Sequence, residues 1–91
     1  MQNYSKLPVG LQDGMQRYVE HGILPGDFLT AVLENNLFTA VSRADDTNIK
    51  LIPEIVKWIY NEIPQHSWGS PKDVEEWTAK FAKPLGVTNG R

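Results

Sequence analysis

Cysteine is absent from this chain of 91 residues. The chain can therefore form no disulfide, no thiolate nucleophile and no zinc site built on sulfur. It also lacks an apolar run near the ~20 residues that span a bilayer. Its first residues, MQNYSK, do not contain the apolar core of a signal peptide. We therefore expect a cytoplasmic protein that makes no contact with a membrane.

The chain also lacks a large excess of positive or of negative charge. Nine lysines and arginines stand against 11 aspartates and glutamates, which gives a formal net charge of −2. Binding to nucleic acid through its phosphates needs a basic face. Imitation of a DNA backbone needs far more negative charge than this chain carries. We therefore do not expect nucleic acid to be the principal partner.

Motifs that carry chemistry are also missing. The two histidines, His21 and His66, do not occur in a metal-binding spacing such as HExxH. The DDTN stretch at 45–48 lacks the glycine and distal glutamate of a calcium loop, so we interpret it as a helix cap. Ser67 and Ser70 lie beside His66 without a GxSxG turn or an orienting acid. We predict no metal, no cofactor and no enzymatic activity.

Helical periodicity is what the chain does have. Apolar residues recur at helical spacing, and no useful stretch alternates as a β-strand does. The predicted helices cover residues 9–20, 28–34, 37–44, 48–62 and 71–83. Gly22 is the expected left-handed residue after the first helix. Asn35 and Asn36 suit a tight turn, because asparagine tolerates positive φ.

These helices predict an all-α fold, a compact bundle of four or five short helices around a central helix near residues 48–62. We expect a single domain over residues 1–91, with a loose N-terminus (1–8) and a C-terminal tail (85–91). A chain of this length buries roughly 60–65% of the surface that its unfolded state exposes, which is enough for one modest core.

The central segment is the most apolar. Its apolar residues form two neighbouring rows, Ile49, Ile52, Val56, Ile59 and Ile63 in one and Leu51, Ile55 and Trp58 in the other. The polar residues form one narrow stripe, so we expect only that stripe to face water. Pro53 leaves two alternatives open. Either the helix begins near Ile52, or an earlier turn exists and bends at the proline.

Two other helices have predicted inner faces. These are Leu37, Phe38, Ala40 and Val41 in the third helix, and Val74, Trp77 and Phe81 in the last. Two of the predicted helices are apolar on nearly every side, which is more apolar surface than one small core can cover. We therefore predict self-association into a homodimer.

The start of the last helix is the clearest local signal. Ser70 suits the N-cap, Pro71 the first helical position, and Asp73 the position that reaches back to the cap. Trp68 lies just outside this helix, on a loop. It serves either as a lid over the core or as an anchor for a partner, and we favour the lid.

Large aromatic and charged side chains are the candidates for binding a partner. Trp58 and Trp77 lie on apolar stripes, so we expect both in the core. The candidate partner-binding residues are Trp68, Tyr4, His66 and Arg17.

Four stretches of the chain carry a family resemblance. They are MQRYVEHGILPGDFLTAVL at 15–33, RAD at 43–45, YNE at 60–62 and WGSP at 68–71. Over about residues 11–80 their combination resembles a group of small proteins of unassigned function encoded by tailed bacteriophages and prophages. The resemblance implies a bacterial host cytoplasm and an accessory phage role. It carries over no catalytic residue.

Two functions stand as hypotheses. The first is a non-enzymatic protein-binding module, a phage accessory protein that modulates a host or phage protein such as a host nuclease or a defence system. The alternative is a small helical nucleic-acid-binding regulator that uses the last helix. The lysines of that helix, Lys72, Lys80 and Lys83, are diluted by Glu75 and Glu76.

Overall fold

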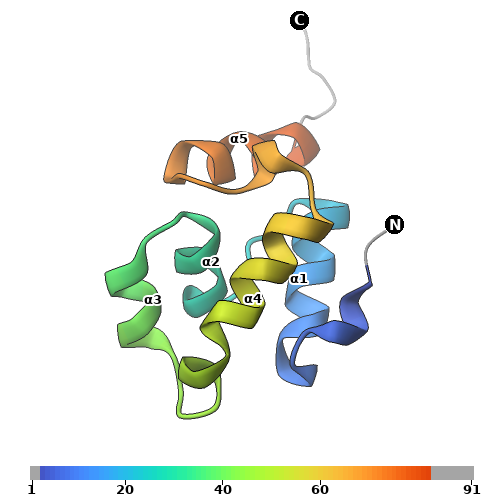
Figure 1. Cartoon of the computed structure of the whole chain (residues 1–91). Helices are drawn as coiled ribbons and strands as arrows, with labels where there is room; N and C mark the ends of the chain where they lie inside the picture. The colour runs from blue at the N-terminus through green and yellow to red at the C-terminus, as the bar shows by residue number, and fades with distance from the viewer. Residues whose placement is uncertain (1–2, 83–91) are drawn as a thin grey trace, which may run out of the picture.

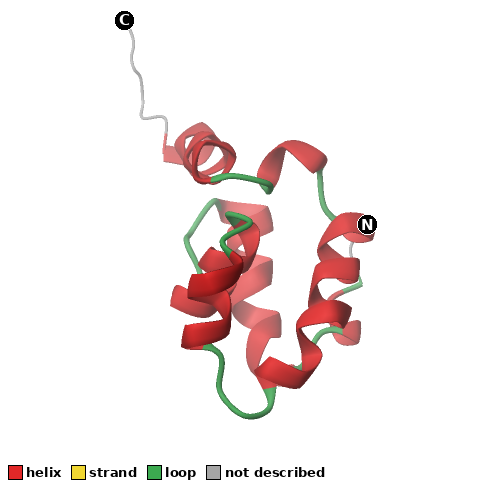
Figure 2. Ribbon diagram, turned by 60° about the vertical axis from the view of Figure 1, so that its left-hand side comes forward, coloured by secondary structure: helices red, strands yellow, loops and turns green. Residues whose placement is uncertain are grey.

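The computed structural model describes residues 3–82, and within them the protein is an all-α bundle with no strand, as predicted. Figure 2 shows that these residues form only helices and loops. The α-helices are α1 (Val9–His21), α2 (Asp27–Leu33), α3 (Leu37–Arg43), α4 (Asn48–Glu62) and α5 (Pro71–Ala82). Two single-turn 3₁₀ helices, η1 (Tyr4–Lys6) and η2 (Gln65–Ser67), complete the described chain.

α4 is the central helix, with α1 on one side and the α2–α3 pair on the other, and α5 lies across one end of the bundle (Figure 1). The buried apolar side chains come from all five α-helices and from Leu7 and Ile63 outside them. Trp58 and Trp77 are both buried, as predicted, and each indole nitrogen donates to a backbone carbonyl.

The predicted turn signals end α1 and α2. Gly22 has a φ of +67°, and its N–H donates to the Tyr18 carbonyl at 3.0 Å. Asn35 has a φ of 62°, and the next residue, Asn36, accepts from the Thr39 N–H at 3.2 Å as the cap of α3. These residues therefore close one helix and open the next through their own backbone and side-chain chemistry.

α4 begins before its proline. The Asp45 carboxylate accepts from the Asn48 N–H at 2.7 Å, and the Asp45 carbonyl accepts from the Ile49 N–H at 2.9 Å. The acidic stretch is therefore a helix cap, as predicted. The helix runs through Pro53, so it does not begin at Ile52. Pro53 is exposed, and its missing N–H leaves the Ile49 carbonyl without the usual helical donor.

The N-terminal segment differs from the loose end we expected. Over residues 3–7 it forms η1 and is held against α4. The Trp58 indole donates to the Asn3 carbonyl at 2.9 Å, and Leu7 is buried. This docking buries the apolar surface of Leu7 and gives the buried indole N–H of Trp58 an acceptor. The segment is mostly polar in composition, so its sequence alone does not predict the docking. The predicted C-terminal tail (85–91) lies outside the described residues.

The predicted inner face of α3 is wrong at three of its four residues. Leu37, Phe38 and Val41 are exposed, and Ala40 is the buried residue of this helix. A seven-residue helix has only two turns, and α3 packs against α2 with Ala40, its smallest apolar side chain, in the core. Its larger apolar side chains therefore point away from the core.

Two further predicted inward positions are also corrected. On α4, Ile49 and Val56 are exposed in addition to the polar stripe, while Ile59 of the same row is buried. On α5, Phe81 is exposed whereas Val74 and Trp77 are buried. None of the described helices covers the side of α4 that carries Ile49 and Val56, whereas Phe81 contacts the end of α1 at Gly22 with one side and keeps the other in solvent.

Candidate functional site

An apolar groove lies between the α2–α3 pair and α4. It consists of two adjoining hollows, of about 60 Å³ and about 150 Å³, that share Val32, Asn35 and Val56. The smaller hollow is completed by Asn36, Leu37, Ala40 and Ile52, and the larger by Ile59, Tyr60, Trp68 and Gly69. We call these residues together the apolar groove.

None of the residues of the apolar groove carries a charge. Its edges are highly exposed, since Leu37 keeps 60% of its accessible surface and Tyr60 keeps 69%. Phe38, next to Leu37 at the start of α3, is 86% exposed. The centres of protein interfaces are depleted in charge and enriched in aromatic side chains, and this surface has the same composition.

Trp68 forms one wall of the larger hollow. Its ring lies 5.8 Å from that of Tyr60, centroid to centroid, and the side chain is half-buried against the core. The N–H of the following residue, Gly69, donates to the Leu33 carbonyl at 2.8 Å and ties this loop to the end of α2. Trp68 therefore covers part of the core with one side and lines the apolar groove with the other.

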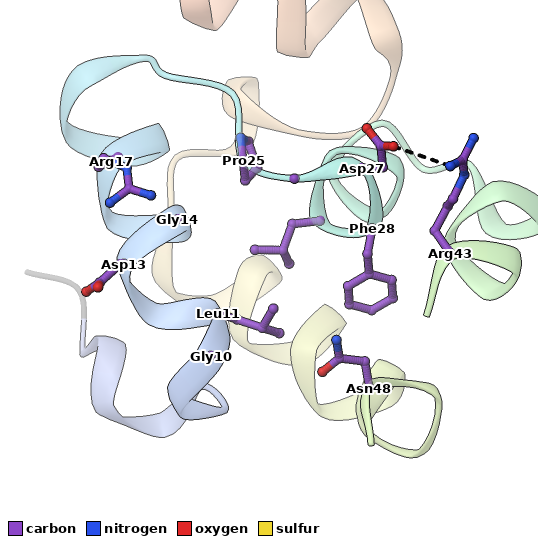
Figure 3. Close-up of a pocket in the computed structure, with 12 residues that line it drawn as sticks. Gly10, Leu11, Asp13, Gly14, Arg17, Pro25, Asp27, Phe28, Arg43 and Asn48 are labelled. Carbon is purple, nitrogen blue, oxygen red and sulfur yellow. Dashed lines mark hydrogen bonds and ion pairs between the residues drawn. The ribbon is translucent and has the colours of Figure 1, made fainter. Parts of the chain in front are cut away.

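A larger and more polar cleft of about 630 Å³ separates α1 from the start of α2 (Figure 3). Asp13 and Arg17 line it from α1, and Asp27 and Arg43 line its opposite side. Asp27 and Arg43 form an exposed ion pair at 3.4 Å, which contributes little stability in water. Charges of the two signs balance, so the polar cleft favours no ligand of one charge.

His66 lies in a small cluster at α5. Its ring centroid is 5.3 Å from that of Trp77, and its Nε2 is 3.4 Å from the Lys80 ammonium. The same ammonium lies 4.2 Å above the Trp77 ring, a cation–π arrangement. His66 and Trp68 also line one shallow hollow of about 500 Å³, so two of the four candidate residues are brought together.

The other two candidates, Tyr4 and Arg17, lie elsewhere. Arg17 is exposed at the polar cleft. Tyr4 is half-buried against Trp58, with ring centroids 5.5 Å apart, and its hydroxyl is buried without a partner among residues 3–82. Burial, together with the nearby Glu20 carboxylate, raises the pKa of Tyr4 to about 12. Neither residue contributes to the apolar groove.

The two serines beside His66 have structural roles. Ser67 is fully buried, and its hydroxyl donates to the Pro64 carbonyl at 2.6 Å. Ser70 caps α5, because its hydroxyl oxygen accepts from the Asp73 N–H at 3.1 Å and its proton is directed to the Asp73 carboxylate at 2.9 Å. Neither hydroxyl is aligned with the imidazole as a nucleophile.

Metal-binding clusters and membrane-spanning helices are both absent from residues 3–82. No group of three or more histidines, aspartates or glutamates there is arranged to hold a metal ion. No helix within that part combines the length and the apolarity needed to cross a membrane.

The sequence did not identify the exposed apolar residues in and beside the apolar groove. Leu37, Phe38 and Val56 were expected in the core, and Tyr60 was not singled out. The signal that pointed to them was the excess of apolar residues over what one core can cover. That excess predicts an exposed apolar surface, but periodicity alone does not place it.

Comparison with known proteins identified no relative, since no protein-family model, no curated protein and no solved structure matches the chain.

Proposed function

We propose that this protein is a non-enzymatic protein-binding module that uses the apolar groove to bind another protein. The observation that carries the proposal is a continuous uncharged surface, with Leu37 and Tyr60 at its two ends and Val56 between them. Small monomeric proteins seldom expose large contiguous apolar patches unless these bind something.

The aromatic side chains of the larger hollow support this proposal. Tyr and Trp are enriched among the residues that dominate binding energy at interfaces. Tyr60 and Trp68 flank a hollow of about 150 Å³, large enough for one apolar side chain. The loop of Trp68 is held to α2 by the Gly69–Leu33 hydrogen bond, so the wall is preorganised.

The lysines of α5 give less support to the alternative, a nucleic-acid-binding regulator. Lys72 lies 3.9 Å from Glu76 on the next turn. Lys80 lies over Trp77 and beside His66. Phosphate binding requires several cations on one face, and these two side chains are instead placed against local neighbours. A protein partner therefore agrees better with the described surface.

The biological setting is proposed from sequence. The resemblance of residues 11–80 to small proteins of tailed bacteriophages and prophages supports an accessory phage protein in the bacterial cytoplasm. Its partner is then a host or phage protein, for example a nuclease or a component of a defence system.

Affinity capture from a bacterial lysate, followed by mass spectrometry, tests the proposal with two matched variants. Val56→Arg places a charge at the centre of the apolar groove. Val9→Arg places the same charge on a side chain that is 85% exposed and lies outside the apolar groove. We expect the wild-type and Val9→Arg proteins to capture the same partner, and Val56→Arg to lose it. Equal capture by all three would refute the role of the groove.

A further inference from the structure

We infer that residues 3–7 form a strap that opens and closes over Trp58 while the helical bundle stays folded. The strap consists of η1 with Asn3 before it and Leu7 after it. It covers a face of α4 other than the apolar groove, because Trp58 and Val56 are two residues apart and therefore point to nearly opposite sides of the helix. The opening of the strap and the proposed function therefore stand or fall separately.

The strap is held at its two ends. At the first end, the Asn3 carbonyl accepts from the Trp58 indole at 2.9 Å, and the Asn3 N–H donates to Glu62 Oε1 at 3.2 Å. At the second end, Leu7 is buried and its carbonyl accepts from the Gln12 amide at 2.9 Å. The bond between Asn3 and Glu62 is exposed, so water can replace it at a small cost in free energy.

The middle of the strap is held less well. The Tyr4 ring packs against that of Trp58, with centroids 5.5 Å apart, but its hydroxyl is buried without a hydrogen-bond partner among residues 3–82. Burial of an unpaired hydroxyl is unfavourable, and opening returns it to water. A hollow of about 260 Å³ also separates Lys6 from the polar edge of α4. Both features favour the open state relative to a fully satisfied strap.

The core of the bundle does not need the strap. Leu7 is the buried side chain that the strap contributes, and the other buried apolar side chains in the described chain belong to the five α-helices and Ile63. Opening therefore exposes Leu7 and Trp58 but leaves the packing of the helices on one another in place. Segments with few buried contacts and exposed hydrogen bonds open locally with less free energy than global unfolding requires.

Hydrogen exchange of two indole N–H groups, measured by NMR on the full chain, tests the inference. Trp58 and Trp77 are equally buried, and each donates to a backbone carbonyl at 2.9 Å. The acceptor of Trp58 lies in the strap, whereas that of Trp77 is Tyr18 in α1. We expect Trp58 to exchange at least about 10-fold faster than Trp77, because its exchange needs only local opening.

Urea below the unfolding transition gives an independent readout. Denaturant accelerates an opening in proportion to the surface that the opening exposes. Exchange at Trp58 is therefore expected to depend weakly on urea, and exchange at Trp77 steeply. Equal exchange rates with the same urea dependence would overturn the inference, because both indoles would then be exposed by one global event.

Two buried aliphatic side chains provide a matched pair of variants. Val74→Ala, in α5, destabilises the bundle whether the strap is closed or open. It is expected to accelerate exchange at Trp77 by about 10-fold or more and to leave Trp58 unchanged. Leu7→Ala destabilises the closed strap and is expected to accelerate exchange at Trp58 by about 30-fold or more. Equal acceleration of both indoles by Val74→Ala, or no effect of Leu7→Ala on Trp58, would reject the strap.

Tyr4→Phe tests the strap without removing any packing. It deletes the unpaired hydroxyl and keeps the ring against Trp58, so it is expected to slow exchange at Trp58 by about 5-fold or more. Exchange at Trp58 that is unchanged or faster in Tyr4→Phe would contradict the role of this hydroxyl in opening the strap.

Discussion

The side chain of Phe81, near the end of α5, lies directly on the backbone of Gly22, at the end of α1. A Cβ atom at Gly22 would lie 2.7 Å from Phe81 Cγ and 2.8 Å from its Cβ, closer than packed atoms approach. Gly22 also has a φ of +67°, which residues with a side chain seldom adopt. The glycine therefore both ends α1 and permits α5 to dock against it.

We predict that Gly22→Ala lowers the free energy of unfolding by about 2–4 kcal/mol, since the strained φ and the overlap with Phe81 add together. In a Phe81→Ala background the same change is expected to cost about 1 kcal/mol less, because the overlap with the ring is gone and only the contact with the Cβ atom of residue 81 remains. Urea denaturation of the four proteins measures this difference.

Gly10→Ala is the matched control for Gly22→Ala. A Cβ at Gly10 meets nothing within 4 Å, and the residue lies in the first turn of α1. The change is expected to stabilise the protein by up to about 1 kcal/mol. Equal losses at the two glycines would show that the Phe81 contact is not what requires a glycine at position 22.

The Ser70 cap provides a second prediction. Ser70→Ala removes the acceptor for the Asp73 N–H and is expected to lower the free energy of unfolding by ~1 kcal/mol. Ser42→Ala removes an exposed hydroxyl that donates to the Thr39 carbonyl within α3, and its effect is expected to stay within about 0.5 kcal/mol. Thermal denaturation of both variants compares them, and a neutral Ser70→Ala would disprove the cap's contribution.

Two tyrosines with raised pKa values, Tyr18 and Tyr4, lead us to predict that the stability of the fold falls at alkaline pH. Tyr18 is fully buried and donates to the Ser67 carbonyl at 2.6 Å. Burial chiefly, and then the Asp73 and Glu34 carboxylates, raises the pKa of Tyr18 above its usual value. Tyr4 has a pKa raised to about 12.

For both tyrosines the folded state retains the proton more strongly than the unfolded state. Their contribution to stability is therefore complete below about pH 10, the usual pKa of tyrosine, and is lost as the pH rises through the folded-state pKa. We expect the free energy of unfolding to fall above about pH 10 and the fall to be shallower in Tyr18→Phe. That variant is also expected to lose about 1–2 kcal/mol at neutral pH, because the buried Ser67 carbonyl loses its donor. A Tyr18→Phe profile parallel to the wild type would contradict the assignment.

Trp68 is expected to affect both stability and binding, because it covers the core and lines the apolar groove. Trp68→Ala should lower the free energy of unfolding by about 3 kcal/mol, the range for large-to-small changes at buried sites. An unchanged melting temperature would exclude the lid role. Tyr60→Ala is the control, because that ring is 69% exposed and its loss should weaken association with little change in stability.

The boundaries of the helices were predictable because their signals are local. A glycine after α1, asparagines after α2, an acidic cap before α4 and the Ser70 cap before α5 each act through neighbours within four residues. These hydrogen bonds join residues that are close in the sequence and do not depend on how distant helices pack. The spacing of the residues is therefore sufficient to place them. The burial of Trp58 and Trp77 also followed from spacing, because both lie on rows that α-helical geometry brings to one side.

The apolar groove was not predictable in this way, because exposure depends on which other helix covers a given face. Val56 and Ile59 belong to the same apolar row, yet Val56 is exposed and Ile59 is buried. The row marks both as apolar, but only the packing of α2, α3 and the Trp68 loop against α4 determines which of them lies inside. The same reason explains Phe38, whose neighbour Ala40 is small enough for α3 to approach α2 closely while the phenylalanine ring is left outside. Hydrophobicity is carried by each residue, whereas burial is a relation between segments distant in the chain.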